Sequence, residues 1–177
     1  MIRRLLIGAL ATVFLVVAVG RIRRALASDE QTLRWALEEL VENVDSGNVG
    51  KVGSFFHADF HDESSGARYD DVQRALRGLY FRERDPVTRA FRLRLELPEE
   101  LLDLQVEEGS GRAEVDATAR IYALVNGEKR PWWDARAHII LVQVNGRWRI
   151  LRTSRVNHSE RVGALLGPAS HLVGEDA

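Results

Sequence analysis

The chain has 177 residues, of which 45% are hydrophobic and 29% are charged, and its formal net charge at pH 7 is −1. This composition is typical of one ordinary globular domain, and it excludes a largely disordered chain as well as a general nucleic-acid binder, which needs a strong basic excess. The sequence contains no cysteine, which excludes disulfides, thiolate metal sites and cysteine nucleophiles.

The first element is an uncharged apolar run at residues 5–20, with arginines on both sides. As a helix it would be about 24 Å long, somewhat short of a ~30 Å hydrocarbon core, but arginines at its ends can snorkel. The motif at residues 25–27, Ala-Leu-Ala, also fits a signal-peptidase site, whereas the three arginines before it disfavour cleavage. We therefore predict a retained membrane anchor over residues 1–27, with a cleaved signal as the alternative.

The orientation of this anchor rests on the arginines that flank it. Their numbers before and after the apolar run nearly balance. A short basic N-terminus ahead of a long exported domain is the commoner arrangement, so we predict a single-pass membrane protein with its domain outside the cytoplasm. The near balance leaves the opposite orientation open.

Three helices are predicted next. Ser28 with Gln31 forms a capping box, and apolar residues then recur at helical spacing until the sequence DSGN ends the helix. Asn48 caps a second, short helix that extends through two phenylalanines. Asp70 caps a third helix, which Pro86 closes.

After the helices the apolar period changes to two, which predicts β-strands. Apolar and polar residues alternate through residues 91–97, 102–106 and 115–123, and Asn145-Gly146 is typical of a two-residue hairpin turn. Helices followed by a meander predict an α+β fold, with an N-terminal transmembrane helix and then three helices packed on a strongly curved antiparallel sheet.

Two hairpins set the predicted register of this sheet. The turn at Asn145-Gly146 pairs Leu141 with Ile150 and Ile139 with Arg152. A three-residue loop at 126–128 places apolar residues opposite apolar ones on one face and oppositely charged or polar residues opposite each other on the other face. The pairs in this register are Ile121 with Trp133, Ala119 with Ala135, Ala117 with Ala137, Arg120 with Asp134, Asp116 with His138 and Tyr122 with Trp132. Asp134, Arg136 and His138 then lie on the outer face.

The inner face of the predicted sheet carries four alanines, Ala117, Ala119, Ala135 and Ala137. Their small side chains leave room for either a closely packed helix or a cavity. We predict that a pocket for a small hydrophobic or anionic ligand is lined by Tyr80, Phe91, Trp133, Trp148 and an inward-pointing Arg152. An arginine on such a face needs a helix carboxylate as its partner or an anionic ligand at a wet mouth, and both alternatives stay open.

The turn DSGNVGKVGSFFHADF, the third helix before a long meander and the closing strand NGRWRI resemble the nuclear-transport-factor-2-like superfamily, including its polyketide-cyclase-like (SnoaL-like) group. The resemblance implies a cone of curved sheet wrapped by helices over residues 28–157. The weak patterning of residues 158–177 predicts a loosely structured tail after it. The superfamily includes isomerases, dehydratases, hydrolases, binders, dimerising scaffolds and membrane-anchored members, so the fold alone does not give the function.

Candidate catalytic groups are few. His57 and Asp59 are weak candidates near the expected mouth of the cone, and no carboxylate is clearly placed inside the cone as a general base. We predict no metal site and no cofactor. The predicted function is therefore a membrane-anchored module with a non-catalytic ligand-binding or protein-assembly role. The alternative is a small-molecule enzyme of the dehydratase, isomerase or hydrolase type with a pocket inside the cone.

An apolar patch is also predicted on the outer face of the sheet, at Ile140, Val142 and Leu151. A contiguous apolar patch on a free sheet face marks a partner surface, and members of the resembled superfamily commonly dimerise through the sheet. We expect a homodimer, or a membrane protein as the partner.

Overall fold

The computed structural model describes residues 27–160, and it describes side chains as far as residue 154. The predicted anchor segment at 5–20 and the tail beyond residue 160 lie outside the described residues. The predicted retention of residues 1–27 concerns the same undescribed segment. None of the helices within 27–160 is long and apolar enough to cross a membrane.

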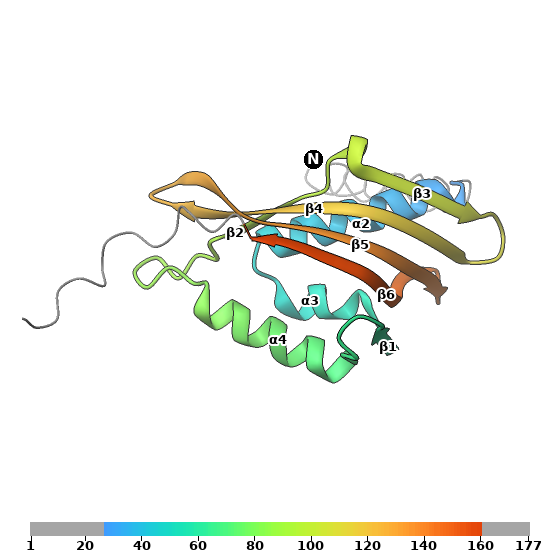
Figure 1. Cartoon of the computed structure of the whole chain (residues 1–177), viewed down its shortest axis with the longest axis horizontal. Coiled ribbons are helices and arrows are strands. Elements are labelled where there is room, and N and C mark those ends of the chain that lie inside the picture. The colour runs from blue at the N-terminus through green and yellow to red at the C-terminus, as the bar shows by residue number, and fades with distance from the viewer. Residues whose placement is uncertain (1–26, 161–177) are drawn as a thin grey trace, which may run out of the picture.

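The described chain forms helices first and a meander of strands afterwards. The helices α2 (Asp29–Asp45), α3 (Val49–Ser54) and α4 (Tyr69–Arg82) are joined by the strand β1 (Phe56–Asp62) between α3 and α4. The strands β2 (Leu93–Glu96), β3 (Leu102–Glu107), β4 (Arg112–Val125), β5 (Glu128–Val144) and β6 (Arg147–Glu160) follow, with the short 3-10 helix η1 (Glu99–Leu101) before β3. Figure 1 shows α2 along one face of a curved sheet and α3 and α4 beyond the β6 edge, which confirms the α+β fold.

The helix starts follow the predicted caps at two of three positions. The Ser28 hydroxyl accepts a hydrogen bond from the Gln31 amide at 3.2 Å, and the Asn48 side chain accepts one from the Lys51 amide at 3.2 Å. The prediction that Asp70 caps the third helix is wrong. The cap residue is Arg68, two positions earlier, and its amide hydrogen is accepted by the Asp71 carboxylate at 3.0 Å.

The second helix is shorter than predicted, and a strand follows it. The helix α3 ends at Ser54, and residues 56–62 form β1, which pairs in parallel with β6. Phe56 lies opposite Ile150 in this pair. The β1–β6 pairing therefore provides hydrogen bonds for backbone groups that would otherwise be bonded within a longer helix. His57 therefore lies in a strand and not at a helix end.

The sheet has the order β1-β6-β5-β4-β2, and β3 also pairs with β4. The β1–β6 pair is parallel, whereas the other pairs are antiparallel as predicted. The predicted register is confirmed at Leu141–Ile150, and it is confirmed for most of the β4–β5 ladder: Ile121–Trp133, Arg120–Asp134, Ala119–Ala135, Ala117–Ala137 and Asp116–His138.

Bulges change two of the predicted pairings. The β4–β5 turn has two residues, Asn126 and Gly127, both with positive φ, so the predicted three-residue loop is wrong. The extra residue is instead Trp132 in β5, so Tyr122 faces Pro131 and not Trp132. In β6 the extra residue is Leu151. The predicted pairing of Ile139 with Arg152 is therefore wrong, because Arg152 lies opposite Ile140.

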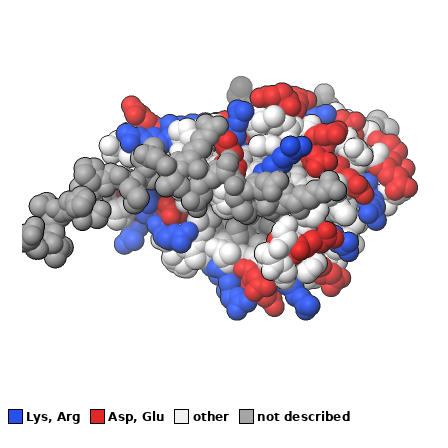
Figure 2. Space-filling model, viewed as in Figure 1, with Lys and Arg blue, Asp and Glu red and all other residues white. Residues whose placement is uncertain are grey.

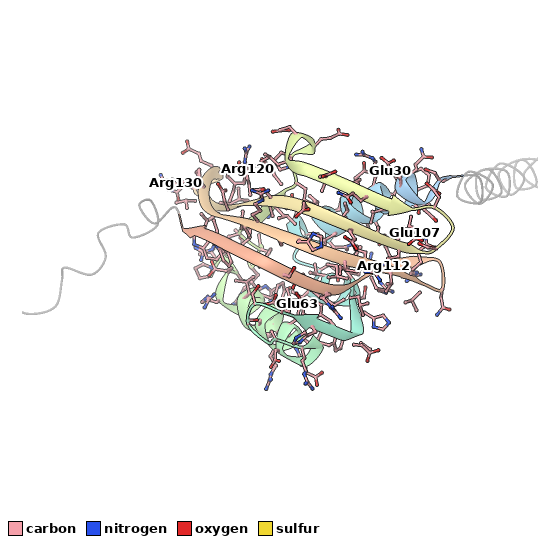
Figure 3. All side chains as sticks on the ribbon, turned by 45° about the vertical axis from the view of Figure 1, so that its right-hand side comes forward. Glu30, Glu63, Glu107, Arg112, Arg120 and Arg130 are labelled. Carbon is pink, nitrogen blue, oxygen red and sulfur yellow. The ribbon has the colours of Figure 1, made fainter. Side chains whose placement is uncertain are left out.

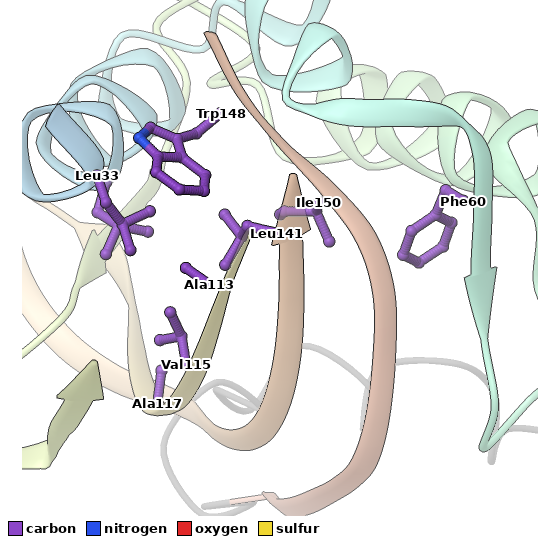
Figure 4. Packing of buried hydrophobic residues seen from close by; sticks show 9 residues of the cluster. Leu33, Phe60, Ala113, Val115, Ala117, Leu141, Trp148 and Ile150 are labelled. Atoms are coloured by element: carbon purple, nitrogen blue, oxygen red, sulfur yellow. The ribbon is translucent and has the colours of Figure 1, made fainter. Parts of the chain in front are cut away.

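The core lies between α2 and the inner face of the sheet (Figure 4). Leu33 of α2 and Val115 of β4 are fully buried. The core cluster consists of Leu33, Leu37, Phe60, Ala113, Val115, Ala117, Leu141, Trp148 and Ile150.

Candidate functional site

The structure separates the five residues that were predicted to line one pocket. Tyr80 and Phe91 lie together, with ring centroids 5.8 Å apart, next to Gly47. Trp148 is a core residue with 3% exposure, and its indole nitrogen donates to the hydroxyl of Thr32. Trp133 is half-buried on β5 opposite Ile121.

Arg152 is a correction to the predicted pocket. The Leu151 bulge moves Arg152 onto the same face as Ile140, and its residue is exposed to solvent. Its guanidinium pairs with the Glu63 carboxylate at 3.1 Å. The prediction that Arg152 points inward is wrong, because the extra residue in β6 reverses the face on which the following side chain lies.

The inner face of the long strands carries apolar side chains. On β4 the inner positions run from Ala113 to Ala123, and on β5 they run from Trp133 to Leu141. Ala119 and Ala135 face each other there and are only half-buried, whereas Ala113 and Val115 under α2 are buried. Such a surface suits apolar contact, and among these side chains only the Trp133 indole carries a hydrogen-bond donor.

A hollow of about 480 Å³ lies between β1 and the start of α4. It is lined by Ala58, Asp59, Phe60, His61, Arg68, Tyr69 and Asp70. The candidate residue Asp59 is in this lining, and its side chain is largely exposed. The other candidate, His57, is not in the lining, and its Nδ1 atom accepts the amide hydrogen of Asp59 at 3.0 Å. The structure thus brings the two candidates together as neighbours in β1.

Next to this hollow, Asp62 forms a hydrogen-bonded junction that the sequence reasoning missed. Its carboxylate accepts hydrogen bonds from the hydroxyl of Thr153, at 2.9 Å, and from the amide of Ser65, at 3.0 Å. Burial raises the pKa of Asp62, but hydrogen bonds from Ser65, Thr153 and Ser64 outweigh it and hold the pKa below its ordinary value. The alternation of Phe56, Ala58 and Phe60 was the available signal for the strand that positions it.

The outer face of the sheet is a charged surface with a small apolar centre. Ile140 lies between Glu114 of β4 and Arg152 of β6, and Val142 lies between Arg112 and Arg149. The predicted interface residue Leu151 is the half-buried bulge residue beside them.

His138 lies next to this centre, and its placement confirms the predicted outer face. Its Nδ1 atom is 3.4 Å from the Asp116 carboxylate, and its Nε2 atom is 3.8 Å from that of Glu114. The described residues hold no group of three or more His, Asp or Glu side chains that could bind a metal ion. His138 thus lies beside two carboxylates on the outer face of the sheet.

Comparison with known proteins gives the fold. No family model matches the sequence, and no curated protein matches it. Among solved structures, an NTF2-like protein with a cystatin-like fold from Novosphingobium aromaticivorans is 14% identical, with a TM-score of 0.57 over 84% of this chain and 90% of that one. The protein Aln2 from a Streptomyces species is 13% identical, with a TM-score of 0.58 over 76% of this chain and 93% of that one.

A third structure bears a name that refers to an activity. It is a candidate scytalone dehydratase from Novosphingobium aromaticivorans, 13% identical, with a TM-score of 0.54 over 75% of this chain and 87% of that one. At these identities the likeness concerns the fold. The chain has the cystatin-like, NTF2-like cone fold of these structures.

Proposed function

We propose that this protein is a membrane-anchored, non-catalytic binding or assembly module that works as a homodimer. In this proposal residues 1–27 hold it in the membrane, the domain lies outside the cytoplasm, and two copies meet through the outer face of the sheet. The observation that carries the proposal is the apolar centre on that face, formed by Ile140 and Val142 with Leu151 beside them.

Charge supports a contact between identical copies. Arg112 and Arg149 flank Val142, while Glu114 and Asp116 lie further along the same face. A two-fold axis near the apolar centre would set the arginines of one copy against the carboxylates of the other. Roughly 200 Å² of apolar surface removed from water would contribute about 5 kcal/mol before association costs, and a shared membrane raises the effective concentration.

The test of the dimer is Val142→Glu in the full chain, with its mass in detergent measured by light scattering. The substitution places a carboxylate at the centre of the contact and leaves the inner core unchanged, so we expect a folded monomer in place of a dimer. Thr118→Glu is the matched control, because Thr118 lies on the same face opposite Arg136, away from the centre. A wild-type chain that is monomeric at high micromolar concentration would contradict the proposal.

The test of the anchor is the intact mass of the protein from the membrane fraction. A retained segment predicts a chain that begins at the original N-terminus. A mature chain that begins at Ser28 in a soluble fraction would contradict this part of the proposal and would leave the dimer test unaffected.

The alternative function is a small-molecule enzyme, and the hollow beside β1 is the observation that favours it. Asp59 and His61 line this hollow with Arg68, so acid, base and cation are present within one surface depression. Native mass spectrometry of the purified chain tests the idea. A copurifying small molecule that is lost in Asp59→Asn and retained in Asp103→Asn, an exposed aspartate on β3, would support it.

A further inference from the structure

The segment 77–92 contains the end of α4 and the turn that follows, and it exposes two apolar side chains. Phe81 is 73% exposed and Val87 is 87% exposed. The other large apolar residues exposed in the described chain, Trp35 and Val144, are exposed at only 37% and 36%. Two large apolar side chains exposed to this degree in one short segment call for a surface that covers them.

The turn that carries Val87 is held by internal hydrogen bonds. The Asp85 carboxylate accepts the amide hydrogens of Val87, at 2.9 Å, and Thr88, at 2.7 Å. The Asp85 amide donates to the Ala90 carbonyl at 2.8 Å, and the Arg89 amide donates to the Asp85 carbonyl at 3.0 Å. The fold thus displays the valine at a defined position, which lowers the entropy lost when a partner covers it.

The same segment is strongly basic. It holds five arginines and two acidic residues. Both acidic residues are already engaged, since Glu83 pairs with Arg82 at 3.2 Å and with Arg92 at 3.4 Å, and Asp85 accepts the turn amides. Within the described residues, Arg77 and Arg89 have no ion pair, so their charges are available to an anion.

The position of the segment in the molecule adds to this charge. It lies at the left-hand end in Figure 1, the end at which the β4–β5 turn also projects. Figure 3 shows Arg120 and Arg130 at this end, and it shows Glu30 and Glu107 together with Arg112 at the opposite end. Figure 2 likewise shows acidic side chains gathered toward the right-hand end of the visible face. One end of the domain is therefore basic and carries exposed apolar side chains.

We propose that segment 77–92 docks on the surface of an anionic lipid bilayer. Phe81 and Val87 protrude from a helix end and a turn, and protruding apolar side chains suit the interfacial region of a bilayer, whereas a protein partner would need a matching pocket. Arginines beside them can place their stems along the apolar boundary and their guanidinium groups among lipid phosphates. The proposal does not depend on the dimer or on the N-terminal anchor.

The experiment uses the absence of cysteine in the chain. A single Thr88→Cys substitution in the full chain carries an environment-sensitive fluorophore. Arg147→Cys, at the first residue of β6, is the matched control position. Each labelled protein is reconstituted into vesicles of neutral phosphatidylcholine or of phosphatidylcholine with phosphatidylglycerol. Empty vesicles that contain phosphatidylglycerol are also added to the protein in neutral vesicles. Docking on the bilayer that holds the protein and docking on a second, anionic bilayer are then both detected.

We expect a blue shift and quenching by lipid-borne nitroxide at position 88 with anionic lipid only, and no change at position 147. Val87→Asp with Arg89→Glu should abolish this response, and Val144→Asp with Arg147→Glu should preserve it. Each unit of charge removed near an anionic surface should weaken partitioning about fivefold.

An equally water-exposed label at position 88 in every vesicle preparation would overturn the proposal, and an acidic protein would then be the better partner. A response that is the same with neutral lipid, or that survives the Val87→Asp and Arg89→Glu substitutions in a chain folded by circular dichroism, would also overturn it.

Discussion

The indole nitrogen of Trp148 donates a hydrogen bond to the hydroxyl of Thr32 at 2.9 Å, and so joins the start of α2 to the last hairpin of the sheet. The ring itself is packed in the core beside Leu33 (Figure 4). A tryptophan in this position serves the fold in two ways, by filling volume and by fixing the direction in which α2 crosses the sheet.

The first prediction separates these two roles. Trp148→Phe should lower the free energy of unfolding by about 1–2 kcal/mol, because it removes the donor and part of the buried volume, while Trp148→Ala should lower it by about 3–5 kcal/mol. Urea denaturation measures both. In a double-mutant cycle with Thr32→Val, a coupling of about 0.5–1.5 kcal/mol is expected for the hydrogen bond, and additive effects of the two substitutions would show that the bond contributes nothing.

The second prediction concerns two glycines. Gly47 has φ +68°, and a Cβ atom there would lie 2.7 Å from Phe91 Cβ and 3.2 Å from Tyr80 Cε2. Gly47→Ala should therefore destabilise the domain by about 2–4 kcal/mol, through backbone strain and loss of the aromatic packing. Gly78 lies in α4 with nothing within 4 Å of its Cβ position, so Gly78→Ala should stabilise by about 0.5–1 kcal/mol. Thermal unfolding of the pair checks the opposite signs.

The third prediction is a pH dependence that comes from Asp62. Its pKa in the folded state lies below the unfolded value of about 3.9, because of the hydrogen bonds from Ser65 and Thr153. The unfolded chain therefore binds the proton more readily, so the stabilisation from this group is fully present above about pH 3.9 and is lost as pH falls through the folded pKa.

The variant for this prediction is Asp62→Asn. It should be less stable than wild type at pH 7, and the difference should shrink as pH falls below about 4. Urea midpoints at a series of pH values measure the difference. Asp70→Asn is the control for general charge effects, and a wild-type advantage that stays constant down to low pH would contradict the role of Asp62.

The elements that the sequence predicted correctly depend on local signals. The caps at Ser28 and Asn48 and the Asn145-Gly146 turn involve residues within a few positions of one another. The β4–β5 faces were predictable because pairing alanine with alanine and Arg120 with Asp134 excludes the other registers. Such signals gave the α+β class and most of the register.

The errors come from long-range pairing. β1 forms because β6 offers a free edge some ninety residues later, and no local pattern encodes that contact strongly. Each bulge adds one residue without a local signal, and Leu151 is one branched apolar residue among several in β6. The sequence therefore predicts the wrong face for Arg152, and the predicted pocket loses its one charged residue.

The fourth prediction tests this bulge directly. Deletion of Leu151 would remove the extra residue from β6, so that Arg152 follows Ile150 directly and stays opposite Ile140 on the outer face, on the side of Glu63. The residues on either side keep their partners in β5, so the deletion should lower the free energy of unfolding by only about 1–2 kcal/mol, mainly because a half-buried leucine side chain is lost. Leu151→Ala keeps the residue count and the bulge, so it should cost about 1 kcal/mol. Circular dichroism with urea denaturation compares the two variants. Arg152→Leu should have the same small effect in the wild-type and the deletion background, because the guanidinium lies on the outer face in both. A loss of about 3–5 kcal/mol on deletion that Arg152→Leu restores would show that Arg152 had turned toward the apolar face, and would contradict the assignment of Leu151 as the extra residue.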